Sequence, residues 1–362
     1  SSSDGPFKNP LNYRRDNFTG NYTRQLTDHR ALGFRFNAGR NHFVSSGQLP
    51  LDEVAAGRLD RFGFLDPDNG GRVRSGVSSL YFRNEFNDGS SLKVDGFVAR
   101  SLFDLFSNFT FFANDEQFGD EIQQHDSRLQ QGVNAQYLKP LTVFGHHALF
   151  TSGANYHDNQ INVGLYPSIG RVPNRPDALV TKTNARVTNT AGYVQQSVSL
   201  WQGKLHLDGG LRFDYFRFAV RDRVQPEFSG LQGAGRFQPK VNLAFTPSLK
   251  IPATIYFNYG RGISSQDARG VAQRPESPRL STTDFYQTGA SFNANRLSVS
   301  TDLFLINRSN EQVYIPDDGS IEFKGPSRAY GVEVKASAKL TRTLSFSAGI
   351  TRVGNAFYRN EV

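Results

Sequence analysis

The residues best suited to bind a ligand are arginines in the long polar stretches between strand-like segments. A guanidinium group forms two parallel hydrogen bonds with a carboxylate or another oxyanion, so these arginines suit an acidic ligand. The candidates are Arg58, Arg61, Arg171, Arg175, Arg261, Arg269, Arg274 and Arg279, with Tyr166, Tyr286 and Tyr314 as possible apolar walls. The alternative is structural, because carboxylates in the same stretches could pair with the arginines.

A second set of charged residues alternates with apolar residues inside the strand-like segments. Successive side chains of a strand point to opposite faces, so in 205–215 Leu211 and Phe213 share one face while Arg212 and Asp214 share the other. The charged residues placed on polar faces in this way are Arg35, Lys93, Asp95, Arg212, Asp214, Glu333 and Lys335. Opposite charges on neighbouring strands pair, so the default role is structural and direct substrate contact is the alternative.

No pattern in the chain indicates catalysis or a bound cofactor. The sequence lacks a phosphate-binding loop, a zinc-binding His-Glu-x-x-His helix and a Gly-x-Ser-x-Gly elbow, and it contains no Cys. His146 and His147 are adjacent, but they fall in a short connection where exposed turn histidines are the simpler interpretation. We therefore predict a protein that is not an enzyme and has no metal site or cofactor.

About fourteen strand-like segments are joined alternately by short and long connections. The short ones are 27–30, 87–90, 139–147, 201–203, 247–252, 294–296 and 341–343. The long ones are 44–75, 114–126, 158–185, 220–235, 262–281 and 308–327. Strict sorting of connections by length is typical of a transmembrane barrel, with short periplasmic turns and long extracellular loops.

The length of the segments favours the same architecture. Many alternating runs reach about 10–16 residues, against about 5–6 for ordinary strands and 9–11 for strands that cross a bilayer at a tilt. The sequence thus predicts an all-β, antiparallel up-and-down transmembrane barrel. Both ends of the chain would lie on the long-loop side, whereas bacterial barrels keep their termini in the periplasm. We expect residues 1–362 to be a partial barrel domain that lacks its first and last strands.

Charge is distributed unevenly along the chain. The net charge is +8, yet the six long connections carry 14 basic and 20 acidic residues, a net of −6, so the remainder carries +14. The positive residues are scattered through strands and turns and form no single basic run that could follow a phosphate backbone. This distribution argues against nucleic-acid binding.

Several stretches, taken together, resemble the barrel of TonB-dependent outer-membrane receptors. They are QLPL (48–51), GRLDRFG (57–63), DPDNGG (66–71), YFNYGRG (256–262) with DARG (267–270), and SRAYGVE (327–333). The resemblance implies a barrel of twenty-two strands around an N-terminal plug, of which this chain would hold about fourteen strands and no plug. It also implies a periplasmic TonB-type partner that acts through the plug, and lumen charges that contact the plug.

The resemblance implies active uptake of a scarce nutrient chelate across the bacterial outer membrane, with a ferric siderophore as the leading substrate. A vitamin, another metal complex or an oligosaccharide is an alternative within the same family. A passive porin or secretion pore, and a soluble adhesive β protein, are alternatives from other classes. Outer-membrane lipid and lipopolysaccharide are the expected neighbours of a monomeric barrel, and loop arginines could also bind lipopolysaccharide.

Overall fold

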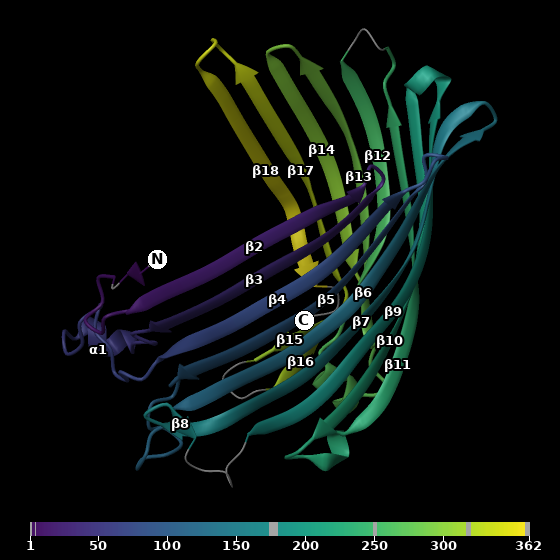
Figure 1. Cartoon of the computed structure of the whole chain (residues 1–362). Helices are drawn as coiled ribbons and strands as arrows, with labels where there is room; N and C mark the ends of the chain where they lie inside the picture. Colours follow the sequence, from purple (N-terminus) through teal and green to yellow (C-terminus); the bar gives the residue numbers. More distant parts are fainter. Residues whose placement is uncertain (1, 4, 174–179, 249–251, 316–319, 359–362) are drawn as a thin grey trace.

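The computed structural model describes residues 2–3, 5–173, 180–248, 252–315 and 320–358. Fourteen long strands form one antiparallel sheet in which each pairs with the next long strand along the chain (Figure 1). They are β2 (Tyr13–Thr27), β3 (Arg30–Val44), β4 (Gly70–Glu85), β5 (Ser91–Ser107), β6 (Ile122–Val143), β7 (His146–Ile169), β9 (Thr181–Leu200), β10 (Leu205–Asp222), β11 (Gly230–Phe245), β12 (Ala253–Ser265), β13 (Leu280–Ala294), β14 (Leu297–Arg308), β17 (Ser327–Lys339) and β18 (Ser345–Tyr358). The predicted all-β, antiparallel up-and-down class is confirmed.

The remaining elements are short. β1 (Ser2–Ser3) pairs with β2, β8 (Val172–Pro173) pairs with β7, and β15 (Glu311–Tyr314) and β16 (Ile321–Lys324) form a separate hairpin. The helical segments are α1 (Leu51–Ala55), η2 (Trp201–Gly203), η3 (Pro226–Phe228) and α2 (Ala268–Gln273). Within the described ranges, no helix has the length and apolar character needed to span a membrane.

Seven short connections join the strands at one end of the sheet, at the positions that the sequence predicts. The connection between β4 and β5 shows why the chain turns there. The Asp88 carboxylate accepts hydrogen bonds from the hydroxyl and the backbone N–H of Ser90. Gly89 adopts a φ of 77°, which few other residues tolerate. The hydrogen bond from the Ser90 hydroxyl, followed by that from its N–H, lowers the pKa of Asp88.

Six long connections lie at the other end, but two of them are shorter than predicted. β7 continues to Ile169 and β9 begins at Thr181, so the prediction of a loop over 158–185 was wrong for most of that stretch. β10 and β11 take up much of 220–235 in the same way. At the end of β7 the alternation continues, but Ile161, Val163 and Leu165 lie on the concave face, the reverse of the arrangement in the middle of the strand. The start of β9 carries polar residues on both faces, so the period-two pattern that marks a strand is lost there.

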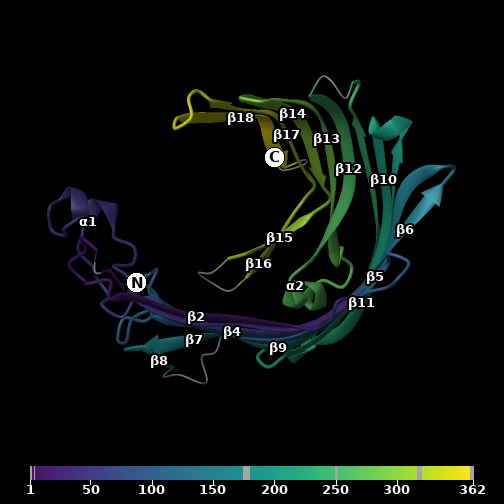
Figure 2. The ribbon, with the colours of Figure 1, turned by 45° about the horizontal axis from the view of Figure 1, so that its top comes forward.

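The sheet curves into a C-shaped wall with a concave and a convex face (Figure 2). Large apolar side chains on the convex face are exposed, among them Leu80, Val98, Val133, Tyr156 and Tyr215. Polar side chains prevail on the concave face. Apolar residues outside and polar residues inside are the arrangement of a barrel that contacts lipid and encloses a wet lumen.

A chain of hydrogen bonds, here named the polar belt, crosses six strands on the concave face. Its members are Asp95, Asn134, Asn155, Asn189, Arg212, Asp214 and Gln238, on β5, β6, β7, β9, β10 and β11. Arg212 donates to Asn155 and to Asp214, each at 2.6 Å. Asp214 is only 3% exposed, so its three hydrogen-bonding partners replace the water that its carboxylate has lost.

Two of the long connections fold back onto the concave face. α2 packs on β10, where Phe218, Val271 and Leu280 form an apolar cluster and are 0%, 1% and 2% exposed. The helix begins at Asp267, whose side chain accepts a hydrogen bond from the backbone N–H of Arg269. Figure 2 shows α2 and the β15–β16 hairpin inside the curve of the sheet. The inner wall is therefore covered near the long-loop end.

Breaking the polar belt should destabilise the sheet. In the full-length protein, we expect Asp214→Asn to lower the free energy of unfolding by about 1–3 kcal/mol, because Arg212 would lose its ion-pair partner in a partly buried site. Thermal unfolding in detergent, followed by circular dichroism, measures the effect. Glu333→Gln removes a carboxylate from a more exposed pair with Lys335 and should cost less than about 1 kcal/mol. Equal losses in both variants would contradict this role of the polar belt.

The docking of α2 should depend on its apolar contact. Val271→Asp would bury a charge among Phe218 and Leu280, so we expect the helix to leave the concave face. Limited proteolysis of the full-length protein would then cleave within 268–273 at least about tenfold faster, because cleavage follows the population of the open form. Val172→Asp, the same change at a valine that is 62% exposed, is the matched control and should not accelerate this cleavage.

Candidate functional site

Side chains from α2 and its flanks meet the β15–β16 hairpin in what we name the mouth cluster. Its members are Gln266, Arg269, Arg274, Arg279, Gln312, Tyr314 and Phe323. The guanidinium carbon of Arg269 lies 5.0 Å from the centre of the Tyr314 ring, and that of Arg274 lies 4.2 Å from the centre of the Phe323 ring. Cation–π contacts of this kind hold the two connections together on the concave side.

Several polar atoms of the mouth cluster are buried without a hydrogen-bond partner among the described residues. They are Nε2 of Gln266, Nε of Arg279, and both Nε2 and Oε1 of Gln312. Each such atom costs about 1–3 kcal/mol unless something bonds to it. Three of these atoms are N–H donors and one, Oε1 of Gln312, is an acceptor. Together with the guanidinium groups of the cluster, the donors favour an anionic ligand that accepts hydrogen bonds.

Sequence reasoning placed Arg269, Arg274 and Arg279 near a ligand but missed Gln266, Gln312 and Phe323. Gln312 is 42 positions beyond Gly270 in the chain, yet a Cβ atom on Gly270 would lie 2.6 Å from Oε1 of Gln312. The close approach of the two connections is a tertiary contact that no local pattern reports. The sequence of α2 contains one hint of this contact, its single glycine Gly270, which leaves room for the side chain of Gln312.

The other arginine candidates have different surroundings. Arg58 forms an exposed ion pair with Glu53 at 2.6 Å, and the Arg61 guanidinium carbon lies 5.5 Å from the centre of the Phe62 ring. Arg175 lies outside the described residues. None of these three is brought to the mouth cluster by a described contact.

Arg171 is used to hold three loops together. Its guanidinium donates to the backbone carbonyls of Asp68 and Asn69 at 2.7 and 3.0 Å, and its backbone N–H donates to the Glu121 carboxylate at 2.9 Å. Burial raises the pKa of Glu121, and the nearby Asp66 and Asp68 carboxylates raise it further. Arg171 thus bridges loops at the rim, away from the mouth cluster.

Arg261, which the sequence offers as a ligand residue, lies on the convex face and outside the mouth cluster. Strand register places Arg261 and Tyr259 on the same face as Phe257, which is on the convex side. Arg261 forms an ion pair with Asp284 at 2.8 Å, and the Tyr259 and Tyr286 rings lie 5.0 Å apart. The chain there has polar residues on both faces, so the sequence pattern did not identify the side.

The three tyrosines suggested as apolar walls also lie in different parts of the structure. Tyr286 lies on the convex face beside Tyr259, and Tyr166 packs against the ring of His125, with 6.4 Å between ring centres. Tyr314 alone of the three tyrosine candidates belongs to the mouth cluster. The apolar wall of the mouth is therefore provided by Tyr314 and Phe323.

Register puts all seven predicted lumen charges on the concave face. Asp95, Arg212 and Asp214 belong to the polar belt described above. The Arg35 guanidinium carbon lies 4.7 Å from the centre of the Tyr81 ring, and Lys335 pairs with Glu333 at 2.7 Å. Lys93 has no hydrogen bond or ion pair within the part of the chain that the structure describes. Contact of these residues with a plug or a substrate stays a prediction.

A family profile described as "TonB dependent receptor-like, beta-barrel" matches residues 5–361. No curated protein sequence matches the chain. The solved structures that resemble it are outer-membrane receptors rather than enzymes. One is the ferric citrate transporter FecA in the unliganded form, with a TM-score of 0.80 and 16% identity over 98% of this chain and 52% of that protein.

Two further structures share the fold at low identity. The ferric preacinetobactin receptor BauA from Acinetobacter baumannii has a TM-score of 0.75 and 12% identity over 97% of this chain and 56% of that protein. The ferric yersiniabactin uptake receptor FyuA from Yersinia pestis has a TM-score of 0.74 and 10% identity over 100% and 55%. The chain spans about half the length of these proteins. Because the family profile covers almost all of the sequence, the chain belongs to the TonB-dependent receptor β-barrel family, whose members reside in the bacterial outer membrane.

Proposed function

We propose that this barrel serves the active uptake of an acidic nutrient chelate, with a ferric siderophore as the leading substrate, across the outer membrane. The observation that carries the proposal is the mouth cluster. Three guanidinium groups and several unsatisfied polar atoms lie together on the concave side, where a ligand coming from the long-loop end would meet them. Arginine donors there would hold the carboxylates or other oxyanions of a chelate.

The chemistry of the mouth cluster distinguishes among the possible cargoes. Arg269 forms an ion pair with Asp267 at 3.2 Å, whereas Arg274 and Arg279 form no ion pair among the described residues. A neutral oligosaccharide would leave these two charges without a counterion, and a ferric chelate with acidic groups would neutralise them. Tyr314 and Phe323 would pack against the apolar parts of such a ligand. The proteins that share the fold include a ferric citrate transporter, a ferric preacinetobactin receptor and a ferric yersiniabactin uptake receptor, which supports the same class of substrate.

The transport step is a part of the proposal that extends beyond this chain. A TonB-type periplasmic protein would supply energy through a plug inside the barrel, and Arg35, Lys93 and Asp95, which lie on the concave face, would contact that plug. The polar belt would keep the strands of the barrel in register while the plug moves. A passive pore is the alternative mechanism, and family membership favours the receptor.

Growth on defined iron sources tests the uptake proposal. A deletion strain supplied with single ferric chelates under iron limitation should fail to grow on at least one acidic chelate, and the full-length gene should restore growth. An energy-coupling mutant should show the same defect if transport is active. Normal growth of the deletion strain on every chelate would contradict siderophore uptake, and growth without energy coupling would favour the passive pore.

The mouth cluster is tested by ligand binding to the full-length receptor. We expect Arg274→Ala to raise the Kd for the transported ferric chelate at least about tenfold, since one charge-assisted hydrogen bond contributes about 1.5–3 kcal/mol. Fluorescence quenching or calorimetry in detergent measures this Kd. Arg261→Ala removes an arginine from the convex face and is the matched control. An equal effect of both changes, or none from Arg274→Ala, would contradict the assignment.

A further inference from the structure

Three carboxylates at the long-loop end of the sheet form what we name the rim acidic cluster. Asp66 and Asp68 come from the connection between β3 and β4, and Glu121 comes from the end of the connection between β5 and β6. One oxygen atom from each of the three residues lies within 4.8 Å of those from the other two. Figure 1 shows α1 and β8 at this same end of the sheet. Carboxylates at such distances repel one another unless a positive charge lies among them.

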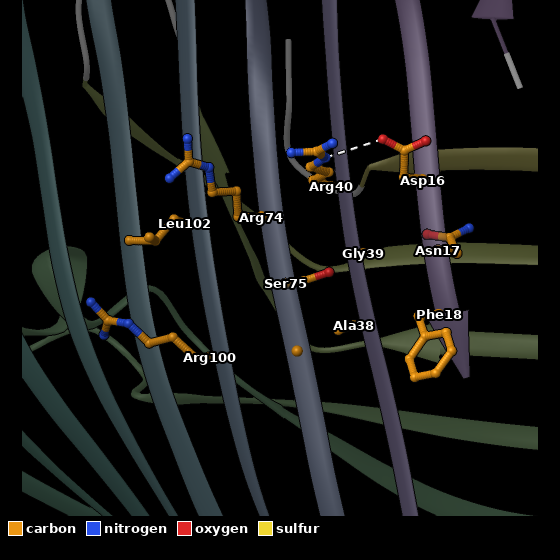
Figure 3. A pocket seen from close by; sticks show the side chains of 11 residues that line it. Asp16, Asn17, Phe18, Ala38, Gly39, Arg40, Arg74, Ser75, Arg100 and Leu102 are labelled. Carbon is orange, nitrogen blue, oxygen red and sulfur yellow. Dashed lines mark hydrogen bonds and ion pairs between the residues drawn. The ribbon is translucent and has the colours of Figure 1, made fainter. Parts of the chain in front are cut away.

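No basic side chain neutralises the rim acidic cluster within the described ranges. Its three carboxylates form no ion pair there, and that of Asp68 accepts no hydrogen bond. The guanidinium of Arg171 donates instead to the backbone carbonyls of Asp68 and Asn69. The carboxylate of Asp16, at the same end of the sheet, is by contrast paired with Arg40 at 3.1 Å (Figure 3).

A buried amide next to the cluster is an independent sign of a missing ligand. Asn108, the residue after β5, is 5% exposed, and its Nδ2 donates to Oδ2 of Asp66 at 3.0 Å. The amide is therefore directed at the cluster, and its Oδ1 is buried without a hydrogen-bond partner among the residues that the structure describes. A buried oxygen of this kind is costly unless something binds to it. Oδ1 is thus a fourth oxygen available to a cation.

The burial of Glu121 makes a counter-charge more important. Its side chain is 5% exposed, and Oε1 accepts hydrogen bonds from the hydroxyl of Ser168 at 2.6 Å and the backbone N–H of Arg171 at 2.9 Å. Oε2 accepts no hydrogen bond in the described part of the chain, so it remains free to bind a ligand. Neutral donors do not cancel the charge of a buried carboxylate, whereas a cation does.

The donor atoms and their spacing indicate which cation fits. Carboxylate and amide oxygens are hard ligands, which suit Ca²⁺ or Mg²⁺ better than zinc or copper. Two oxygens on opposite sides of Ca²⁺ lie up to about 4.6–5.2 Å apart, whereas the limit around the smaller Mg²⁺ is about 4.0–4.2 Å. The cluster, with separations of up to 4.8 Å, accommodates Ca²⁺ without the contraction that Mg²⁺ would require.

We propose that the rim acidic cluster binds one Ca²⁺ ion, with Asp66, Asp68, Glu121 and Asn108 as protein ligands and water in the remaining positions. The ion would join the β3–β4 connection, which contains α1, to the β5–β6 connection, beside the bridge that Arg171 makes to the same loops. The site is independent of which chelate, if any, the receptor carries. No metal site is predicted from the sequence, because Glu121 follows Asp68 by 53 positions and no local motif connects them.

Calcium binding to the full-length receptor tests the site, by isothermal titration calorimetry in detergent after treatment with a chelator. We expect a Kd of about 1 mM or tighter, as in extracellular calcium modules. Asp68→Asn should raise this Kd at least about tenfold, because a charged ligand is lost while no internal hydrogen bond is broken. Asp52→Asn removes an exposed carboxylate of α1, in the same connection, and is the matched control that should leave the Kd unchanged.

Protection from trypsin gives a second measurement on the same proteins. Arg58 and Arg61 are exposed in the connection that the ion would hold. At about ten times the Kd, Ca²⁺ should slow cleavage after these residues about tenfold, because binding lowers the population of the open form. In Asp68→Asn the same Ca²⁺ concentration should slow cleavage only about twofold or less. Addition of EGTA should abolish the protection.

The proposal is overturned if the unaltered receptor binds no more Ca²⁺ than Asp68→Asn, or if Asp52→Asn loses as much affinity. It is also overturned if Glu121→Gln leaves the Kd unchanged, or if Mg²⁺ binds as tightly as Ca²⁺. Normal heat-modified mobility on gels confirms that each variant is folded. None of these outcomes depends on growth with a ferric chelate, so a failure here is distinguishable from a failure of the uptake proposal.

Discussion

Backbone hydrogen bonding within lipid is the constraint on which the rest of this structure depends. No water is available there to satisfy an unpaired N–H or C=O group, so a strand in the bilayer must be paired with neighbours. Successive pairing of the long strands from β2 to β18 meets this requirement. Once the strands are paired, the alternation of side chains is the remaining means of separating a lipid face from a wet face.

Charge is sorted by that alternation and by position along each strand. On the concave face, charged groups are joined to amides, as in the polar belt, where Asp214 is almost completely buried and yet satisfied. On the convex face, charge lies towards the two ends of the strands and is mainly positive, as with Arg40 and Arg74 next to the long loops and Arg24 and Lys139 next to the short turns. The long connections themselves are net acidic. A chain with a net charge of +8 can therefore present different charges to lumen, membrane surface and medium.

The strand pattern could be predicted from the sequence, whereas much of the candidate site could not. Turn residues such as Asp88 and Gly89 act on their own neighbours, so the short connections were placed correctly. The end of β7 was missed because its apolar residues lie on the concave face, the reverse of the middle of the strand, and the start of β9 because polar residues occupy both of its faces. Arg261 was chosen as a ligand residue by its chemistry alone, and strand register places it on the convex face. Arg274 was recognised by its chemistry alone, without its contact to Phe323.

The sequence by itself determined the class of fold, the number of strands, the order of turns and loops, and the polar face of most strands. These follow from interactions within a few residues, where alternation and turn chemistry act. Only the tertiary structure decided which loops fold inward, which arginines meet, and which charges gather outside. Val271 of α2 and Phe218 of β10 become neighbours through loop docking, and Arg40 of β3 and Arg74 of β4 become neighbours through strand register. Contacts between residues so far apart in the chain leave no periodic signal in it.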